Sequence, residues 1–316
     1  MTHNASACPK RSSLARLQQG LVISWVVAAL VWVAWSAPRS GWLCLGGLLL
    51  LAGGHAIVLA VQLLCRVAVA GDDTSSKPRM GELVRAWRTE SWLAVRVFAW
   101  QQPFRWRKFP DSLQSPAGWR AVVLVHGFVC NRGFWLPWLG ELRRRQRPYV
   151  TVNLEPVFGS IDDYVPVIDA AVQRARKLTG RDPLLVGHSM GGLAIRAWLV
   201  SAHDAPLRVH RVITIGSPHA GTWLANWSRV PNGRQMRPLG AWLDQLAQKE
   251  RAMRGDAPYT AFTCWYANTD NIVFPVLSAT LPGADNRQVR GAPHVGLAYE
   301  SQVLADVIQG LDEPAH

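Results

Sequence analysis

The chain has 316 residues and a formal net charge of +13, from 34 Lys and Arg against 21 Asp and Glu. The basic excess is concentrated before residue 121, where 14 Lys and Arg face 5 Asp and Glu, and no nucleic-acid-binding motif accompanies it. We therefore exclude nucleic acid as a partner and expect attraction to anionic membrane lipids. The five cysteines show no disulfide or metal spacing and predict unpaired thiols in a reducing compartment.

Residues 1–20 form a basic tail that is followed by two uncharged runs, 21–37 and 41–65. At 1.5 Å per residue the second run is about 37 Å long, enough to cross a hydrocarbon core of about 30 Å, and the first reaches about 25 Å. We predict a two-helix transmembrane hairpin over residues 21–70. The alternative for the first run is a signal peptide with a cleavage site at 34–36, where Ala34 and Ser36 are the small residues.

The charges around the two runs predict the orientation of the hairpin. Basic residues flank it on both sides, whereas Arg39 alone lies in its turn, so both termini are expected in the cytoplasm. The predicted location is the inner membrane of a bacterium, as a multi-pass protein whose C-terminal domain is cytoplasmic. His55, inside the second run, is either functional or a neutral side chain bonded to the other helix of the hairpin, and we favour the latter.

A polar linker at 71–80 leads into the domain predicted over 81–316. Its first part, 81–119, is basic and rich in tryptophan, and predicts a helix near 81–98 and a strand near 103–109. Two placements are open for its aromatic side chains. They lie on the bilayer surface, or they pack inward as part of the domain.

From residue 120 the chain alternates short β-branched runs with amphipathic helices, which is typical of a mostly parallel sheet with helices on both faces. The predicted strands are 121–125, 149–154, 183–186, 209–215, 261–267 and, more weakly, 288–290. The predicted helices are 133–146, 164–179, 190–202 and 295–311.

The segment 183–193 contains Gly-His-Ser-Met-Gly-Gly between an apolar strand and a helix. A serine on such a sharp, glycine-flanked turn is the pattern of a nucleophile elbow, which exposes the hydroxyl above the sheet edge. We therefore predict Ser189 as a nucleophile, although a plain glycine-rich turn has the same local pattern.

A serine hydroxyl needs a base to remove its proton and an acid to orient that base. Asp270 follows the strand 261–267, and His294 precedes the last helix, so both are expected at the carboxyl edge of the sheet. We favour Asp270 over its rival Asp285 as the acid, and His294 over its rival His219 as the base.

Backbone N–H groups beside the serine are expected to bind the oxyanion of the reaction. His126-Gly127-Phe128 follows the strand 121–125, and the glycine allows the turn that aims the Phe128 N–H at Ser189. With the N–H of Met190 it would form an oxyanion hole, in which each donor is typically worth about 3 kcal/mol.

These motifs together resemble the α/β-hydrolase superfamily over about residues 120–311. The resemblance is carried by Val-His-Gly-Phe at 125–128, the serine motif, Gly-Ser-Pro-His-Ala-Gly-Thr at 216–222, and the chain order serine, aspartate, histidine. Within the superfamily the chain is similar to bacterial triacylglycerol lipases and lipase-like esterases. The resemblance implies the α/β-hydrolase fold, here preceded by two transmembrane helices, and carboxyl-ester hydrolysis through an acyl-serine.

The expected function is that of a membrane-anchored serine hydrolase acting on lipid-like or apolar esters. Thioesterase or acyltransferase activity on the same fold, or a non-catalytic scaffold, are the alternatives. Residues 223–257 are predicted as a lid over an acyl pocket, or as a helix packed on the sheet. Some secreted lipases carry a calcium-binding aspartate where this chain has Gly296, so we predict no metal and no cofactor.

Overall fold

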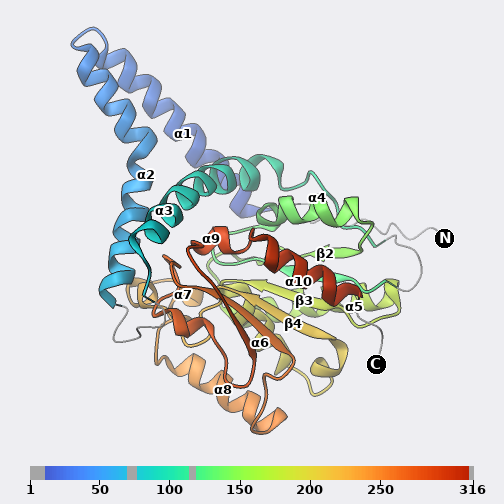
Figure 1. The fold of residues 1–316 in the computed structure, drawn as a ribbon. Coiled ribbons are helices and arrows are strands. Elements are labelled where there is room, and N and C mark those ends of the chain that lie inside the picture. The colour runs from blue at the N-terminus through green and yellow to red at the C-terminus, as the bar shows by residue number, and fades with distance from the viewer. Residues whose placement is uncertain (1–10, 70–76, 114–118, 313–316) are drawn as a thin grey trace, which may run out of the picture.

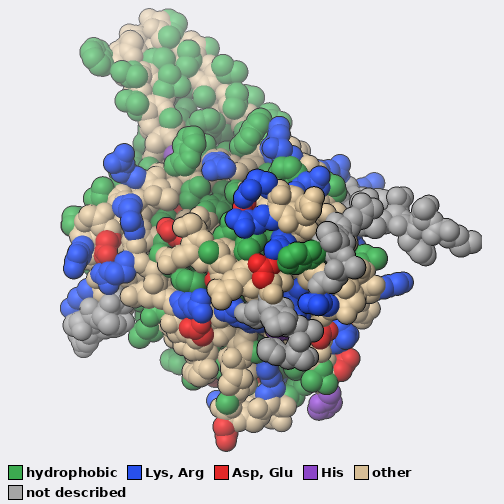
Figure 2. All heavy atoms as spheres, turned by 45° about the vertical axis from the view of Figure 1, so that its right-hand side comes forward, with side chains coloured by type: hydrophobic (Ala, Val, Ile, Leu, Met, Phe, Trp, Pro, Cys, Tyr) green, Lys and Arg blue, Asp and Glu red, His purple; other side chains and the backbone are tan. Residues whose placement is uncertain are grey.

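The computed structural model describes residues 11–69, 77–113 and 119–312, so parts of the predicted basic tail and linker lie outside the described residues. Two long helices, α1 (Ser13–Ser36) and α2 (Gly41–Val69), form a hairpin that projects from the rest of the molecule (Figure 1). Only 6% of the most apolar window of each helix is buried, unlike the core helix of a soluble protein. Hydrophobic side chains cover the hairpin surface in Figure 2. Both helices have the length and composition of membrane spans, and the first also resembles a signal sequence.

The base of the hairpin rests on α3 (Met80–Ala94). The Trp87 indole N–H donates to the Ala56 carbonyl oxygen at 2.7 Å, and His55 Nε2 lies 3.1 Å from the carbonyl oxygen of Ser91. The prediction that His55 bonds to the other helix of the hairpin is therefore wrong. The imidazole bonds to α3 because this part of α2 packs against the domain rather than only against α1.

The helix α3 continues directly into wider, π-helical turns at Val95–Arg105. The strand predicted near 103–109 is therefore wrong, because the chain is helical to Arg105 and turns at 106–109. Packing against α1 stabilises this helical segment, in which Val97 and Pro103 are buried. The aromatic side chains of 81–119 are divided, since Trp106 is buried whereas Trp92 and Trp100 are exposed.

The domain is built on six parallel strands in the order β2-β1-β3-β4-β5-β6, which confirms the predicted parallel α/β architecture. The strands are β1 (Val122–Val125), β2 (Tyr149–Thr151), β3 (Leu184–His188), β4 (Arg211–Ile215), β5 (Phe262–Ala267) and β6 (Asp285–Val289). The helices after β1 are α4 (Leu136–Arg144), α5 (Val165–Thr179), α6 (Met190–Leu199), α7 (Pro231–Gln235), α8 (Ala241–Arg254), α9 (His294–Leu297) and α10 (Ser301–Asp312). Short 3₁₀ turns lie between several of them.

Both faces of the sheet are covered, and the strands β1, β2 and β3 are buried along their whole length. Because successive side chains point to opposite faces, Val122 and Leu124 pack with α4 and α10, whereas Val123 and Val125 pack with α5 and α6. The carboxyl ends of β1, β3 and β5 therefore share one edge, where the loops that carry the candidate site begin (Figure 1).

The insertion predicted as a lid, 223–257, carries α7 and α8. Leu243 and Leu246 on α8 are buried, and Glu250 forms an ion pair with Arg196 of α6 at 2.7 Å, with both side chains at most 3% exposed. Tyr259 donates its hydroxyl to the same carboxylate at 2.6 Å. The helix α8 is thus attached to the domain by apolar and charged contacts, and the lid stays a prediction.

The Arg196–Glu250 pair generates a stability prediction. Glu250→Ala leaves the Arg196 guanidinium buried without its carboxylate, which typically costs about 3–5 kcal/mol. We expect a clear fall in melting temperature, measured by circular dichroism on the full chain in detergent. Asp256→Ala, an exposed acid of the same region, is the control. Equal melting temperatures for the two variants would contradict a structural role for the pair.

Candidate active site

Ser189 lies in the sharp turn between β3 and α6 and has φ 54° and ψ −129°. This backbone conformation is strained for a residue with a side chain, and such strain persists only where the surroundings enforce it. Close packing leaves no room for side chains beside it: a methyl group on Gly187 would lie 2.7 Å from the Gly192 nitrogen, and one on Gly191 would collide with the Val125 carbonyl oxygen. The glycines therefore allow the strand and helix to meet at this turn.

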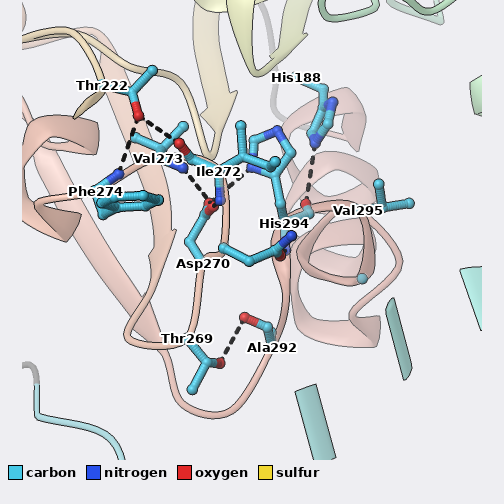
Figure 3. A network of polar contacts seen from close by, with 12 residues as sticks. His188, Thr222, Thr269, Asp270, Ile272, Val273, Phe274, Ala292, His294 and Val295 are labelled. Atoms are coloured by element: carbon cyan, nitrogen blue, oxygen red, sulfur yellow. Dashed lines mark hydrogen bonds and ion pairs between the residues drawn. The ribbon is translucent and has the colours of Figure 1, made fainter. Parts of the chain in front are cut away.

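Asp270 and His294 are in direct contact, as Figure 3 shows, with Asp270 Oδ2 2.9 Å from His294 Nδ1. The other carboxylate oxygen of Asp270 accepts the backbone N–H groups of Ile272 and Val273, each at 2.8 Å. The aspartate is thus held rigidly, and its contact places the imidazole proton on Nδ1. The Nε2 atom of a neutral His294 is then the acceptor, as a general base requires.

Opposing effects act on the pKa of His294. Burial lowers it, but the charge and hydrogen bond of Asp270, with the charge of Glu90, outweigh burial and leave the pKa raised above its ordinary value. A base with a raised pKa accepts a proton more readily from a neighbouring hydroxyl.

A cavity of about 230 Å³ brings Ser189 and His294 together. Phe128 lines the same cavity, and a methyl group on the adjacent Gly127 would lie 2.7 Å from Ser189 Cβ, so this loop runs directly beside the serine. Met190 is the first residue of α6, where backbone N–H groups have no partner within the helix. Of the two predicted oxyanion donors, Phe128 lines the cavity with Ser189, and Met190 follows Ser189 directly in the sequence.

The rival residues lie in other environments. His219 Nε2 is 3.0 Å from the Thr214 hydroxyl, and burial with the nearby Arg196 charge holds the His219 pKa well below its ordinary value. Asp285 is exposed on β6 and pairs with Arg287 at 2.6 Å. His219 does not line the cavity beside Ser189, and it is Asp270, not Asp285, that contacts His294.

Sequence reasoning missed Glu90, a buried carboxylate of α3 that faces the histidine loop. It accepts the backbone N–H groups of Val295 at 3.0 Å and Gly296 at 3.3 Å, immediately after His294. Burial raises the pKa of Glu90 to about 7. The position had no sequence signal, because Glu90 resembles any polar residue of an amphipathic helix until α3 packs on α9.

Two further residues were missed, Asn271 and Gln62. Asn271 Oδ1 accepts the backbone N–H of His294 at 3.1 Å, and Asn271 Nδ2 donates to Gln62 Oε1 in α2 at 2.9 Å. The sequence held one signal: apart from His55, Gln62 is the only strongly polar side chain in the run 41–65. In the described parts of the chain, no group of three His, Cys, Asp or Glu side chains is arranged to hold a metal ion.

A model of the alpha/beta hydrolase family matches residues 122–311, which is more than half of the chain. The chain therefore belongs to the alpha/beta hydrolase family. Triacylglycerol lipase 2 of Saccharomyces cerevisiae is 30% identical over 97 residues, covering 28% of this chain and 30% of the yeast protein. The chain thus matches less than a third of the length of that relative.

Solved structures of lipases share the fold. The mature form of lipase BlEst2 of Bacillus licheniformis has a TM-score of 0.55 at 17% identity, over 63% of this chain and 95% of that one. Lipase B of Aspergillus fumigatus has a TM-score of 0.53 at 18% identity, over 65% of this chain and 56% of that one. At these identities the two structures show the fold of this chain, in agreement with the family match.

The contact of Glu90 with the histidine loop predicts a shift in pH dependence. Because its pKa is about 7, Glu90 is partly ionised near neutral pH, and its charge there raises the pKa of His294, so Glu90→Gln lowers that pKa. Because the base must be unprotonated, the acidic limb of the kcat/KM profile for ester hydrolysis should move to lower pH, by less than about one unit. An acidic limb that stays in place or moves upward would contradict this charge coupling.

Proposed function

We propose that this protein is a membrane-anchored serine hydrolase that cleaves apolar carboxyl esters through an acyl-serine. The observation that carries the proposal is the shared cavity of Ser189 and His294, with Asp270 held 2.9 Å from the imidazole. A serine that shares a cavity with a histidine, and an acid that orients this histidine, are the groups that acyl transfer through a serine uses, which supports the proposal.

In the proposed reaction, Ser189 Oγ attacks the ester carbonyl carbon as its proton passes to His294 Nε2. The N–H groups of Phe128 and Met190 stabilise the negative oxygen of the tetrahedral intermediate. The carbon–oxygen bond to the alcohol then breaks, and the alcohol leaves with the proton from His294. A water molecule, deprotonated by His294, hydrolyses the acyl-serine and restores the serine hydroxyl. Asp270 keeps the imidazole in the required tautomer throughout.

The cavity supports an apolar substrate. Leu59, Ala94, Phe98 and Ile272 contribute carbon-rich walls, and Leu59 comes from the apolar hairpin itself. A lipid-like ester would bury its acyl chain there, and each methylene group removed from water contributes about 0.8 kcal/mol. The name of the yeast relative, a triacylglycerol lipase, agrees with this class of substrate.

The hairpin supports attachment to a bilayer. Many of its apolar side chains are exposed, for example Trp42, Leu49 and Leu64, and the described residues of the protein do not cover them. An apolar surface of this kind is suited to contact with lipid. The excess of basic residues on both sides of the hairpin favours a cytoplasmic domain at the inner membrane of a bacterium.

The nucleophile is tested with Ser189→Ala. We expect hydrolysis of a short p-nitrophenyl ester to fall by at least about 10³-fold, because no other hydroxyl replaces the attacking oxygen. Covalent labelling by a fluorophosphonate should disappear in the same variant. Ser201→Ala, which removes an exposed hydroxyl just beyond α6, is the control with unchanged rates. Retention of the parental rate by Ser189→Ala would refute the proposal.

Orientation in the membrane is tested with C-terminal fusions expressed in bacteria. A cytoplasmic C-terminus predicts a fluorescent green fluorescent protein fusion and an inactive alkaline phosphatase fusion, since the phosphatase needs the oxidising periplasm. The reverse pattern would place the domain on the other side of the membrane.

A further inference from the structure

The second helix of the hairpin takes part in the candidate active site. Leu59 and Gln62 of α2 line the same cavity as Ser189 and His294. The helix α2 lies outside residues 122–311, the part that matches the family model. The hairpin therefore contributes walls and polar contacts to a site whose other parts come from the common fold.

Gln62 reaches the histidine through one intermediate residue. Gln62 Oε1 accepts the side-chain N–H of Asn271 at 2.9 Å. The Oδ1 atom of Asn271 in turn accepts the backbone N–H of His294 at 3.1 Å. Asn271 is 1% exposed and follows Asp270 directly in the chain. One buried amide thus links the aspartate loop, the histidine loop and the hairpin.

The two ends of the Asn271 amide have different requirements. The His294 N–H needs the oxygen of the amide, so the amide nitrogen must point the other way and needs an acceptor there. Gln62 Oε1 supplies that acceptor and so specifies which way the amide is turned. Without it, the buried amide nitrogen loses its partner, and the amide is free to rotate and release the His294 backbone.

The location of Gln62 adds a second reason for this contact. An amide in an otherwise apolar helix is costly in a bilayer unless it is hydrogen-bonded. Its partner in the structure is not the other helix of the hairpin but the loop beside the candidate acid. The contact therefore satisfies Gln62 and anchors the loop at once.

We propose that Gln62 is a positioning residue. Through Asn271 it holds the backbone of His294 in the position from which the imidazole serves Ser189. The inference rests on the proposed serine chemistry and adds that the membrane hairpin is a working part of the site. In metal sites, a hydrogen bond that orients a metal-binding side chain from behind is typically worth about 10–100-fold in activity, and we take the lower end of this range as the guide for Gln62. Gln62 is expected to affect kcat more than KM, because it acts on the base.

The test compares two substitutions of the same length in the full chain, purified in detergent. Gln62→Met removes the acceptor and should lower kcat, and the rate of fluorophosphonate labelling, about tenfold with KM changed less than threefold. Gln62→Glu keeps an acceptor oxygen and should recover most of the loss. Gln19→Met is the matched control, because Gln19 of α1 donates to Pro103 O in the π-helical segment instead of to the catalytic loops.

A double-mutant cycle separates positioning from direct substrate contact. In an Asn271→Ala background, Gln62→Met should cause little further loss, since the link is already broken. An equal loss in both backgrounds, an increase in KM alone, or unchanged kinetics of Gln62→Met would overturn the inference. If the parental protein itself is not labelled at Ser189, the proposed function fails instead, so the two failures are distinguishable.

Discussion

The close approach of β3 and α6 at Ser189 is the constraint on which the rest of the site depends. A serine with φ 54° persists there because Gly187 and Gly191 allow backbone atoms to meet where a side chain would collide. This packing also brings the loop after β1 against the serine, so that Gly127 has no space for a side chain. The turn at Ser189 thus fixes the position of the hydroxyl, and with it the places from which a base and oxyanion donors could act on the serine.

The histidine loop is held from several directions at once. Asp270 contacts the imidazole, while Asn271 and Glu90 accept backbone N–H groups at and just after His294. The last support comes from α3, before the region that matches the family model. An imidazole that must transfer protons needs a defined position, and a loop satisfied by hydrogen bonds on both sides provides it. The helix α3 therefore supports the histidine loop through Glu90.

Features that depend on a short stretch of sequence were predicted correctly, whereas features that depend on packing between distant segments were not. The strands after residue 120 are recognisable because buried parallel strands are continuous apolar runs, and the structure confirms that architecture. The segment 103–109 was mispredicted because its aromatic residues favour a strand, while packing on α1 makes it helical through Arg105. His55 was assigned to the wrong neighbour for a related reason, since hydropathy does not show where a helix touches the domain.

By itself, the sequence determined the apolar hairpin, the parallel sheet and the candidate residues Ser189, Asp270 and His294, because each follows from a local pattern of glycines, strand ends or hydropathy. Only the tertiary structure decided that Asp270, rather than Asp285, meets His294, and that Gln62 and Glu90 reach the loops beside them. Gln62 lies 209 residues before Asn271 in the chain. Such contacts arise only when distant helices pack together, and no local pattern records them.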